Sequence, residues 1–111
     1  MQIYAVDFDG TIVEHKYPLI GDELPLALKT LSELQERGDK VIIWTCRSGD
    51  KLLYMMDWFN KHNFKPDAVN SNYSAKYWDA TPKIYADLYI DDRNIGGFIG
   101  WSKIREILGL K

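Results

Sequence analysis

Four short runs of mostly apolar residues are spaced along the chain as separate β-strands would be. They cover residues 3–8, 41–45, 67–69 and 86–90. Short apolar runs that are rich in β-branched and aromatic residues are typical of strands buried on both faces. The pattern therefore predicts a four-stranded sheet in the interior of the protein.

Between these runs, apolar residues recur at the three- and four-residue spacing of α-helices. Pro25 suits the first turn of the first helix, residues 48–50 open the second, and Gly38 suits the end of the first. Residues 13–22 and 70–82 are polar, or polar with scattered aromatic residues, and are predicted to be loops. The three apolar stripes are Leu24, Leu28, Leu31 and Leu34; Leu52, Leu53, Met56 and Phe59; and Trp101, Ile104, Ile107 and Leu108.

The alternation of strands with helices predicts an α/β fold, a three-layer Rossmann-like parallel sheet. A chain of 111 residues has room for one such domain, residues 1–111, and not for a second. Right-handed crossovers bring the carboxyl ends of parallel strands to one edge, where ligands bind in open α/β sheets. Asp7, Thr45 and Asp91 each come at the end of a predicted strand.

Composition and charge exclude several classes of function. The net charge is −2 and basic residues are scattered, which argues against non-specific binding to duplex nucleic acid. No apolar run approaches the roughly 20 residues that a membrane-spanning helix needs. Cys46 is the single cysteine, and the chain opens directly on a strand without a leader. We therefore expect a protein of the reducing cytoplasm, without a membrane partner.

The most informative segment is Asp7-Phe8-Asp9-Gly10-Thr11, at the end of the first predicted strand. An ionised carboxylate is costly to bury unless a partner or a metal compensates its charge. Two carboxylates facing one point offer oxygen ligands to Mg²⁺, and an Asp can also attack phosphorus as a nucleophile. An ordinary Asp-Gly turn at a strand end is the simpler interpretation of the same residues.

This segment resembles the first signature of the haloacid dehalogenase (HAD) superfamily. The other signatures of the family have counterparts in the same order, namely Thr45, Lys83 and the pair Asp91-Asp92. The resemblance extends over residues 2–94 and is greatest to small phosphatase-like members without a cap domain. It implies the Rossmann-like core that the hydrophobic pattern predicts independently.

The resemblance implies a role for each residue of the first signature. Asp7 is the candidate nucleophile, although metal ligation alone would also explain it. Asp9 would protonate the leaving oxygen, activate water afterwards and offer its backbone carbonyl to the metal. Gly10 and Thr11 would place backbone N–H groups near the phosphate.

The later signatures supply candidates for phosphate binding and charge balance. Thr45 would donate its hydroxyl to a phosphoryl oxygen. Arg47 could bind phosphate, or it could instead cap a helix or pair with a carboxylate, and the sequence favours neither role. Lys83 is the preferred counterpart of the family's lysine, with Lys76 as its rival. Cys46 is not expected to be a nucleophile, because no histidine lies near it in sequence.

A metal site is expected at Asp7, Asp9, Asp91 and Asp92, with Asp91 as a direct ligand and Asp92 acting through water or orienting the lysine. Oxygen ligands and a phosphate substrate favour Mg²⁺ over zinc. Asp91 and Asp92 are adjacent, so both serve one ion only if the chain turns after them. Both histidines are expected on the surface, and contact of His15 with a substrate is the alternative, because His15 lies in the connection after the proposed nucleophile.

The leading hypothesis is a Mg²⁺-dependent phosphomonoesterase that acts through an aspartyl-phosphate on Asp7. The partner would be a small phosphorylated substrate or an exposed phosphate on a larger molecule. A receiver-like signalling domain, a catalytically silent phosphate-binding module and phosphotransfer to another acceptor are the alternatives. No cap fits between the signatures, so an aromatic rim or a homo-oligomer contact is expected from Tyr17, Tyr73, Tyr77 and Trp78.

Overall fold

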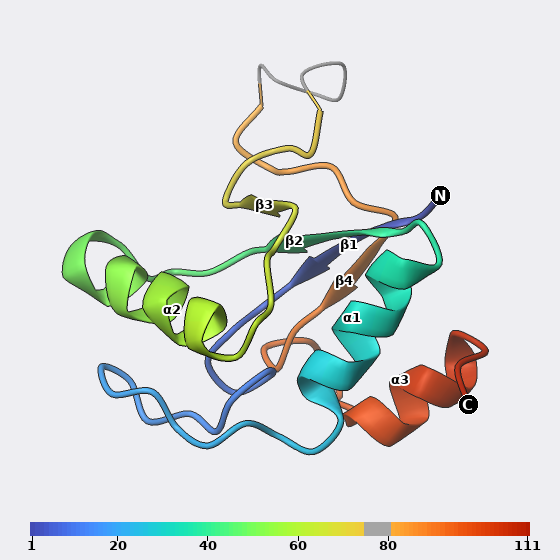
Figure 1. Ribbon diagram of the computed structural model, residues 1–111, viewed down its shortest axis with the longest axis horizontal. Helices are drawn as coiled ribbons and strands as arrows, with labels where there is room; N and C mark the ends of the chain where they lie inside the picture. The colour runs from blue at the N-terminus through green and yellow to red at the C-terminus, as the bar shows by residue number, and fades with distance from the viewer. Residues whose placement is uncertain (75–80) are drawn as a thin grey trace.

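The four strands form one parallel sheet, as the sequence predicts. The computed structural model describes residues 1–74 and 81–111. The sheet order is β3-β2-β1-β4 (Figure 1), and Tyr4 of β1 pairs with Val41 on one side and Leu88 on the other. The strands are β1 Ile3–Val6, β2 Lys40–Ile43, β3 Ala68–Val69 and β4 Leu88–Ile90. Their carboxyl ends therefore lie along a single edge.

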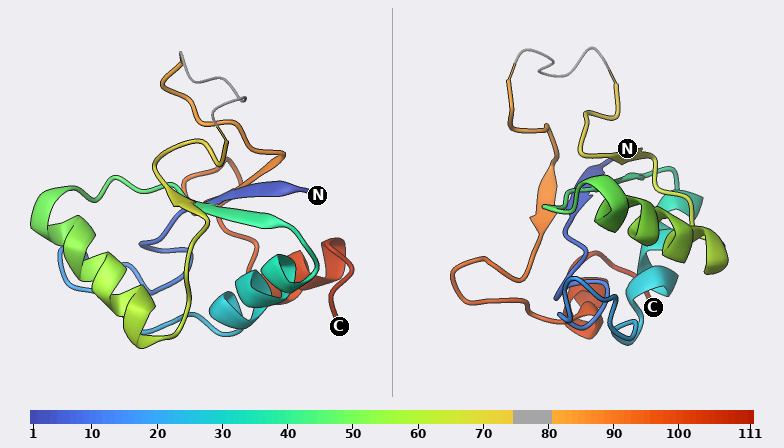
Figure 2. Two further views of the ribbon diagram at one scale, coloured as in Figure 1. Left: turned by 45° about the horizontal axis from the view of Figure 1, so that its top comes forward. Right: turned by 90° about the vertical axis from the view of Figure 1, so that its left-hand side faces the viewer.

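All three described helices lie on one face of the sheet (Figures 1 and 2). They are α1 Ala27–Glu36, α2 Gly49–Lys61 and α3 Trp101–Ile107. The chain steps in the same direction from β1 to β2 and from β2 to β3. Because both crossovers are right-handed, their helices α1 and α2 fall on the same side. Between them and the sheet lies the larger hydrophobic core.

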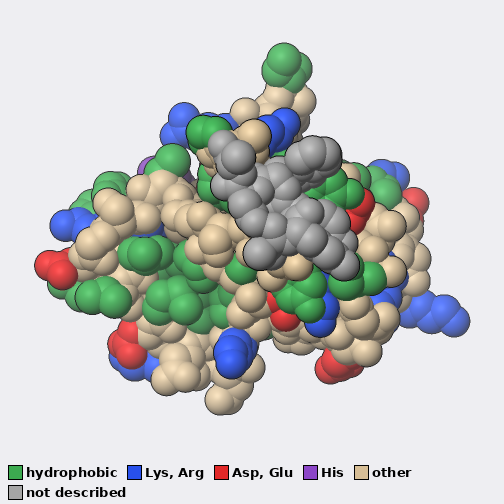
Figure 3. All heavy atoms as spheres, turned by 90° about the horizontal axis from the view of Figure 1, so that it is seen from above, with side chains coloured by type: hydrophobic (Ala, Val, Ile, Leu, Met, Phe, Trp, Pro, Cys, Tyr) green, Lys and Arg blue, Asp and Glu red, His purple; other side chains and the backbone are tan. Residues whose placement is uncertain are grey.

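The opposite face of the sheet is covered by residues 84–86, at the end of the connection between β3 and β4 (Figure 3 views the molecule from this side). Ile3, Ala5 and Ile42 point to this face and pack with Ile84. This connection returns across the sheet in the reverse direction, so a right-handed path places it opposite α1 and α2. The sheet is thus the middle layer of three, and the predicted α/β Rossmann-like class is confirmed.

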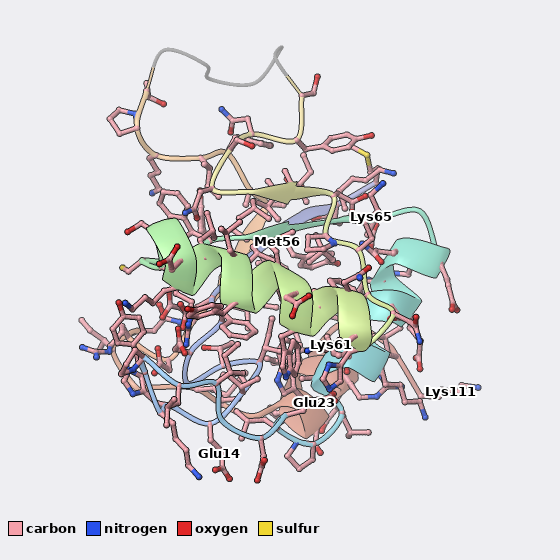
Figure 4. All side chains as sticks on the ribbon, turned by 60° about the vertical axis from the view of Figure 1, so that its left-hand side comes forward. Glu14, Glu23, Met56, Lys61, Lys65 and Lys111 are labelled. Atoms are coloured by element: carbon pink, nitrogen blue, oxygen red, sulfur yellow. The ribbon has the colours of Figure 1, made fainter. Side chains whose placement is uncertain are left out.

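The helical stripes are mostly as predicted, with two corrections at their borders. Gly38 follows α1 with a φ of +97° and donates its N–H to Gln35 O, as expected of a residue that ends a helix. In α2, Leu53 is 64% exposed and Met55 is buried instead, while Met56 packs against the core (Figure 4). In α3, Ile107 is 62% exposed. Both misassigned residues lie at the edge of an apolar stripe, where the sequence cannot locate its centre.

The strands are shorter than the apolar runs that predict them. The ladder of β1 ends at Val6, because Phe8 O accepts hydrogen bonds from the N–H groups of residues 11–13 in a tight turn. The opposite, amino edge of the sheet is closed by the Asp39, Asp67 and Asp87 carboxylates, which accept from backbone N–H groups of neighbouring strands. Among the described residues, no helix is long and apolar enough to span a membrane.

Candidate active site

Three carboxylates meet at the carboxyl edge of the sheet. One oxygen each from Asp7, Asp91 and Asp92 lies within 4.8 Å of the others. The chain turns after β4, as the prediction requires: Arg93 N–H donates to Asp91 Oδ1 at 2.9 Å, and Asn94 Nδ2 donates to Asp91 O at 3.0 Å. This turn is what brings two adjacent aspartates to the same point.

The Asp7 carboxyl group is half-buried between these neighbours and is held by a hydroxyl group. Thr11 Oγ1 donates to Asp7 Oδ2 at 3.1 Å. Burial, followed by repulsion from Asp91 and Asp92, raises the pKa of Asp7 from 3.8 to about 7, although the Thr11 hydrogen bond opposes the shift. The cluster therefore favours either a proton or a cation at its centre.

Gly10 and Thr11 shape the site differently from the expectation. Their backbone N–H groups donate to Val13 O at 2.8 Å and to Phe8 O at 3.2 Å, so the turn itself uses the donors assigned to phosphate. Gly10 instead has a φ of +85° and leaves room for the Asp92 carboxylate, which an added Cβ would strike. Trp101 Nε1 donates to Thr11 O at 2.7 Å and fixes this turn to α3.

Replacing Gly10 by Ala should weaken the cluster's affinity for Mg²⁺ by displacing Asp92. Gly38→Ala is the matched control, because Gly38 also has a positive φ but has open space where its Cβ would lie. Both variants should lose about 1–2 kcal/mol of unfolding free energy from the strained backbone. Calorimetric titration with Mg²⁺ should show a loss of affinity in the Gly10 variant alone; equal affinities would mean that Asp92 does not depend on this glycine.

Asp9 lines the same cavity as Asp7 and Asp92, but its carboxylate forms an ion pair with Arg47. Arg47 Nε donates to Asp9 Oδ2 and Nη2 donates to Asp9 Oδ1, both at 2.8 Å. The Arg47 side chain is 0% exposed and that of Asp9 is 13% exposed. The side chain of Asp9 therefore binds Arg47 and does not belong to the cluster, and metal binding by the Asp9 backbone carbonyl stays a prediction.

The remaining donors of Arg47 tie together two segments around the site. Its guanidinium donates to the carbonyl oxygens of Pro18, Leu19 and Lys51 at 3.1 to 3.3 Å. Tyr17 covers the group with its ring centre 5.0 Å away. All five N–H donors are therefore used, and of the roles open for Arg47 the structure supports pairing with a carboxylate over phosphate binding.

Thr45 lies where the sequence predicts, with a partner that the sequence did not reveal. Asn70 Oδ1 accepts from Thr45 N–H at 2.8 Å, and Asn70 Nδ2 donates to Thr45 O at 2.9 Å. The Thr45 hydroxyl accepts from Arg47 N–H at 3.1 Å and keeps its proton for another acceptor. Asn70 follows β3 with a φ of 51°. Asn tolerates this conformation better than most residues, so an Asn directly after a predicted strand is the one signal of this position in the sequence.

The structure does not bring Lys83 to the carboxylates. The Lys83 ammonium lies 5.2 Å from the ring centre of Tyr89, in a separate hollow beside β4. Lys76, its rival, lies outside the described residues. The family's lysine therefore has no counterpart among the described residues around the carboxylates.

Beside the carboxylates lies a cavity of about 440 Å³ that a substrate could enter. His15 and Tyr17 line it from the connection after β1; His15 is exposed, as expected, and also borders the cavity, which was its alternative placement. His62 is exposed and stacks on Trp58, and Tyr73 lies near Lys40 at the amino end of β2 and is no part of the rim. Tyr77 and Trp78 lie outside the described residues. The cavity is lined by Asp7, Asp9, His15, Tyr17, Thr45, Cys46, Arg47, Asp92 and Arg93.

The donor set of the cluster fits Mg²⁺. Asp7, Asp91 and Asp92 provide carboxylate oxygens only, at a point where repulsion among them favours a cation. Mg²⁺ in proteins is held by one or two carboxylates, water and substrate phosphate, which such an open cluster allows. Within residues 1–74 and 81–111, no nitrogen or sulfur ligand belongs to the cluster, which argues against a zinc site.

The fold and site together define an α/β protein with a carboxylate cluster at the carboxyl edge of a parallel sheet. A solved structure of a conserved protein from Bacteroides thetaiotaomicron has the same fold, with a TM-score of 0.90. It is 42% identical over 97% of this chain and 89% of that one, so the chain belongs to the same family as that protein. No protein-family model and no curated protein matches the chain.

Proposed function

We propose that the protein is a Mg²⁺-dependent phosphomonoesterase of the HAD type that uses Asp7 as its nucleophile. The observation that carries the proposal is the convergence of Asp7, Asp91 and Asp92 beside an open cavity of about 440 Å³. Thr11 donates a hydrogen bond to the Asp7 carboxylate and orients it. The Thr45 hydroxyl accepts from Arg47 N–H, so its proton could be donated to a phosphoryl oxygen. Phosphoryl transfer depends mainly on such positioning and on charge neutralisation.

The proposed reaction has two steps. An Asp7 oxygen bonds to phosphorus while the bond to the leaving oxygen breaks, and water then cleaves the aspartyl-phosphate to inorganic phosphate. Mg²⁺ held by Asp7, Asp91 and Asp92 would neutralise charge on the phosphoryl oxygens. Asp9 would act as general acid and then as general base. One of its oxygens must first leave Arg47 and take up a proton from solvent. Asp9 would give that proton to the leaving oxygen and then take one from the attacking water.

A phosphate-binding module without turnover is the second candidate. Two observations favour it: both oxygens of Asp9 accept hydrogen bonds from Arg47, and Lys83 lies outside the cavity. Such a module would bind phosphorylated ligands with Mg²⁺ and leave them intact. Phosphate release therefore separates the two candidates.

A panel of phosphorylated metabolites, assayed for phosphate release with Mg²⁺ and with EDTA, tests the proposed function. We expect hydrolysis of one class of phosphomonoester in Mg²⁺ and none after chelation. Calorimetry with the same compounds detects binding without turnover. Binding of phosphomonoesters with no release of phosphate would establish the second candidate in place of the first.

Mg²⁺ should raise the thermal midpoint, and the effect should grow with pH. The pKa of Asp7 is about 7 in the folded protein against an ordinary value of 3.8, so the metal-free fold retains a proton that the unfolded chain has lost. This stabilising contribution is complete below 3.8 and disappears as pH rises through about 7. Scanning calorimetry should show that Mg²⁺ raises the thermal midpoint more at about pH 8 than at about pH 5.5. The corresponding gain in unfolding free energy is about 2.7 kcal/mol when Mg²⁺ is at a hundredfold excess over its Kd.

Asp91→Asn and Asp7→Asn provide the controls for this measurement. Asp91→Asn should blunt the Mg²⁺ shift, because it removes one charge from the cluster. Asp7→Asn should remove the fall in metal-free stability over the same pH interval. A midpoint that does not respond to Mg²⁺ at either pH would eliminate the metal site.

A further inference from the structure

The charges around the proposed site do not balance without an additional cation. Asp7, Asp91 and Asp92 contribute three negative charges, and a bound phosphoryl group adds between one and two more. The pair of Asp9 and Arg47 is neutral by itself. One Mg²⁺ compensates two charges, so a protein cation that faces the phosphoryl oxygens would be strongly favoured.

Among the described residues, two cations that the sequence suggests for this role are unsuited to it. Arg47 lines the cavity, but all five of its N–H donors are already used. Lys83 lies over Tyr89, outside the cavity. The cation that faces a bound phosphoryl group must therefore come from elsewhere.

Arg93 is the remaining Lys or Arg among the described residues that line the cavity. Its backbone is fixed beside the cluster, because its N–H donates to Asp91 Oδ1 at 2.9 Å. Its side chain is exposed and makes no ion pair with any described residue. The backbone of Arg93 is thus held beside the cavity, and its guanidinium forms no ion pair with the described residues.

We propose that Arg93 binds the phosphoryl group of the substrate and supplies the positive charge that the HAD resemblance assigns to Lys83. This inference rests on the proposed function. A guanidinium presents two parallel N–H groups to two phosphoryl oxygens, whereas an ammonium acts as a point charge. The Arg93→Lys variant should therefore retain the electrostatic part of the interaction and lose the paired hydrogen bonds.

Calorimetric titration of the Mg²⁺-loaded full chain with inorganic phosphate tests the assignment without relying on turnover. Arg93→Gln should weaken phosphate binding about ten- to a hundredfold, the effect of losing a charge-assisted hydrogen bond. Arg93→Lys should fall between this variant and the wild type. Lys83→Gln and Lys76→Gln are the matched controls and should bind phosphate as the wild type does.

A titration with Mg²⁺ alone distinguishes phosphate binding from a structural role. Removing a positive charge beside a cation site should leave Mg²⁺ affinity unchanged or raise it. A loss of Mg²⁺ affinity in Arg93→Gln would make Arg93 a support for the Asp91 turn and overturn the inference. Unchanged phosphate binding in this variant, with a loss in either lysine variant, would overturn it while leaving the proposed function in place. A wild-type protein that binds Mg²⁺ and no phosphate would overturn both.

Discussion

Replacing Asp7 by Asn is expected to abolish phosphate release while the protein remains folded. The substitution removes the proposed nucleophile and one of the three charges at the metal cluster. Loss of covalent catalysis should raise the activation free energy by at least about 5 kcal/mol, roughly four powers of ten in rate. The measurement is kcat/KM on the best substrate of the panel, with circular dichroism to confirm the fold.

Asp57→Asn is the matched control, because Asp57 is an exposed aspartate that pairs with Lys61 on the surface of α2. Its rate should equal that of the wild type within error. The metal-free Asp7→Asn protein should also be more stable than the wild type near neutral pH, because a charge that is unfavourably buried and repelled by Asp91 and Asp92 is removed. An Asp7 variant that keeps half the wild-type rate would refute the covalent mechanism.

Replacing Arg47 by Met is expected to produce the largest loss of stability in the chain. The Arg47 side chain is fully buried and satisfies Asp9 together with three backbone carbonyl groups. Breaking a buried ion pair by removing one partner costs about 3–5 kcal/mol, because the other charge is left uncompensated. Urea unfolding should show this loss as a lower transition midpoint with little change in slope.

A double-mutant cycle with Asp9→Asn separates the ion pair from the other contacts of Arg47. The double variant should recover part of the loss, since it leaves no buried charge unpaired. Lys61→Met, which breaks the exposed pair with Asp57, should change stability by at most about 1 kcal/mol. A loss below about 1 kcal/mol in Arg47→Met would show that Arg47 does not hold the two segments around the site together.

The sequence alone was sufficient to predict the sheet, because the strand and helix patterns of a parallel α/β fold differ clearly in period. The stripe of Leu28, Leu31 and Leu34 is buried as predicted. The placement of Leu53 was wrong, because Leu52 and Leu53 both continue the helical spacing and the centre of the stripe depends on tertiary packing. That α1 and α2 lie on the same face follows from strand order, which local patterns do not contain.

The sequence also predicted which aspartates meet, because each follows a strand and the carboxyl ends of parallel strands share one edge. It could not decide the partner of Arg47, since a guanidinium binds carboxylates and phosphates through the same geometry. It did not reveal that Asn70 brackets Thr45 through two hydrogen bonds across 25 positions. The expectation for Lys83 came from family spacing, and the structure places this lysine over Tyr89 instead.

Trapping the proposed phosphoenzyme with beryllium fluoride and Mg²⁺ directly tests whether Asp7 is the nucleophile. Beryllium fluoride mimics a phosphoryl group on a carboxylate and requires no knowledge of the substrate. In a crystal structure of the treated protein we expect one adduct on an Asp7 oxygen, and no adduct in Asp7→Asn. An adduct on Asp91 or Asp92, or an empty Asp7 beside bound Mg²⁺, would contradict this assignment.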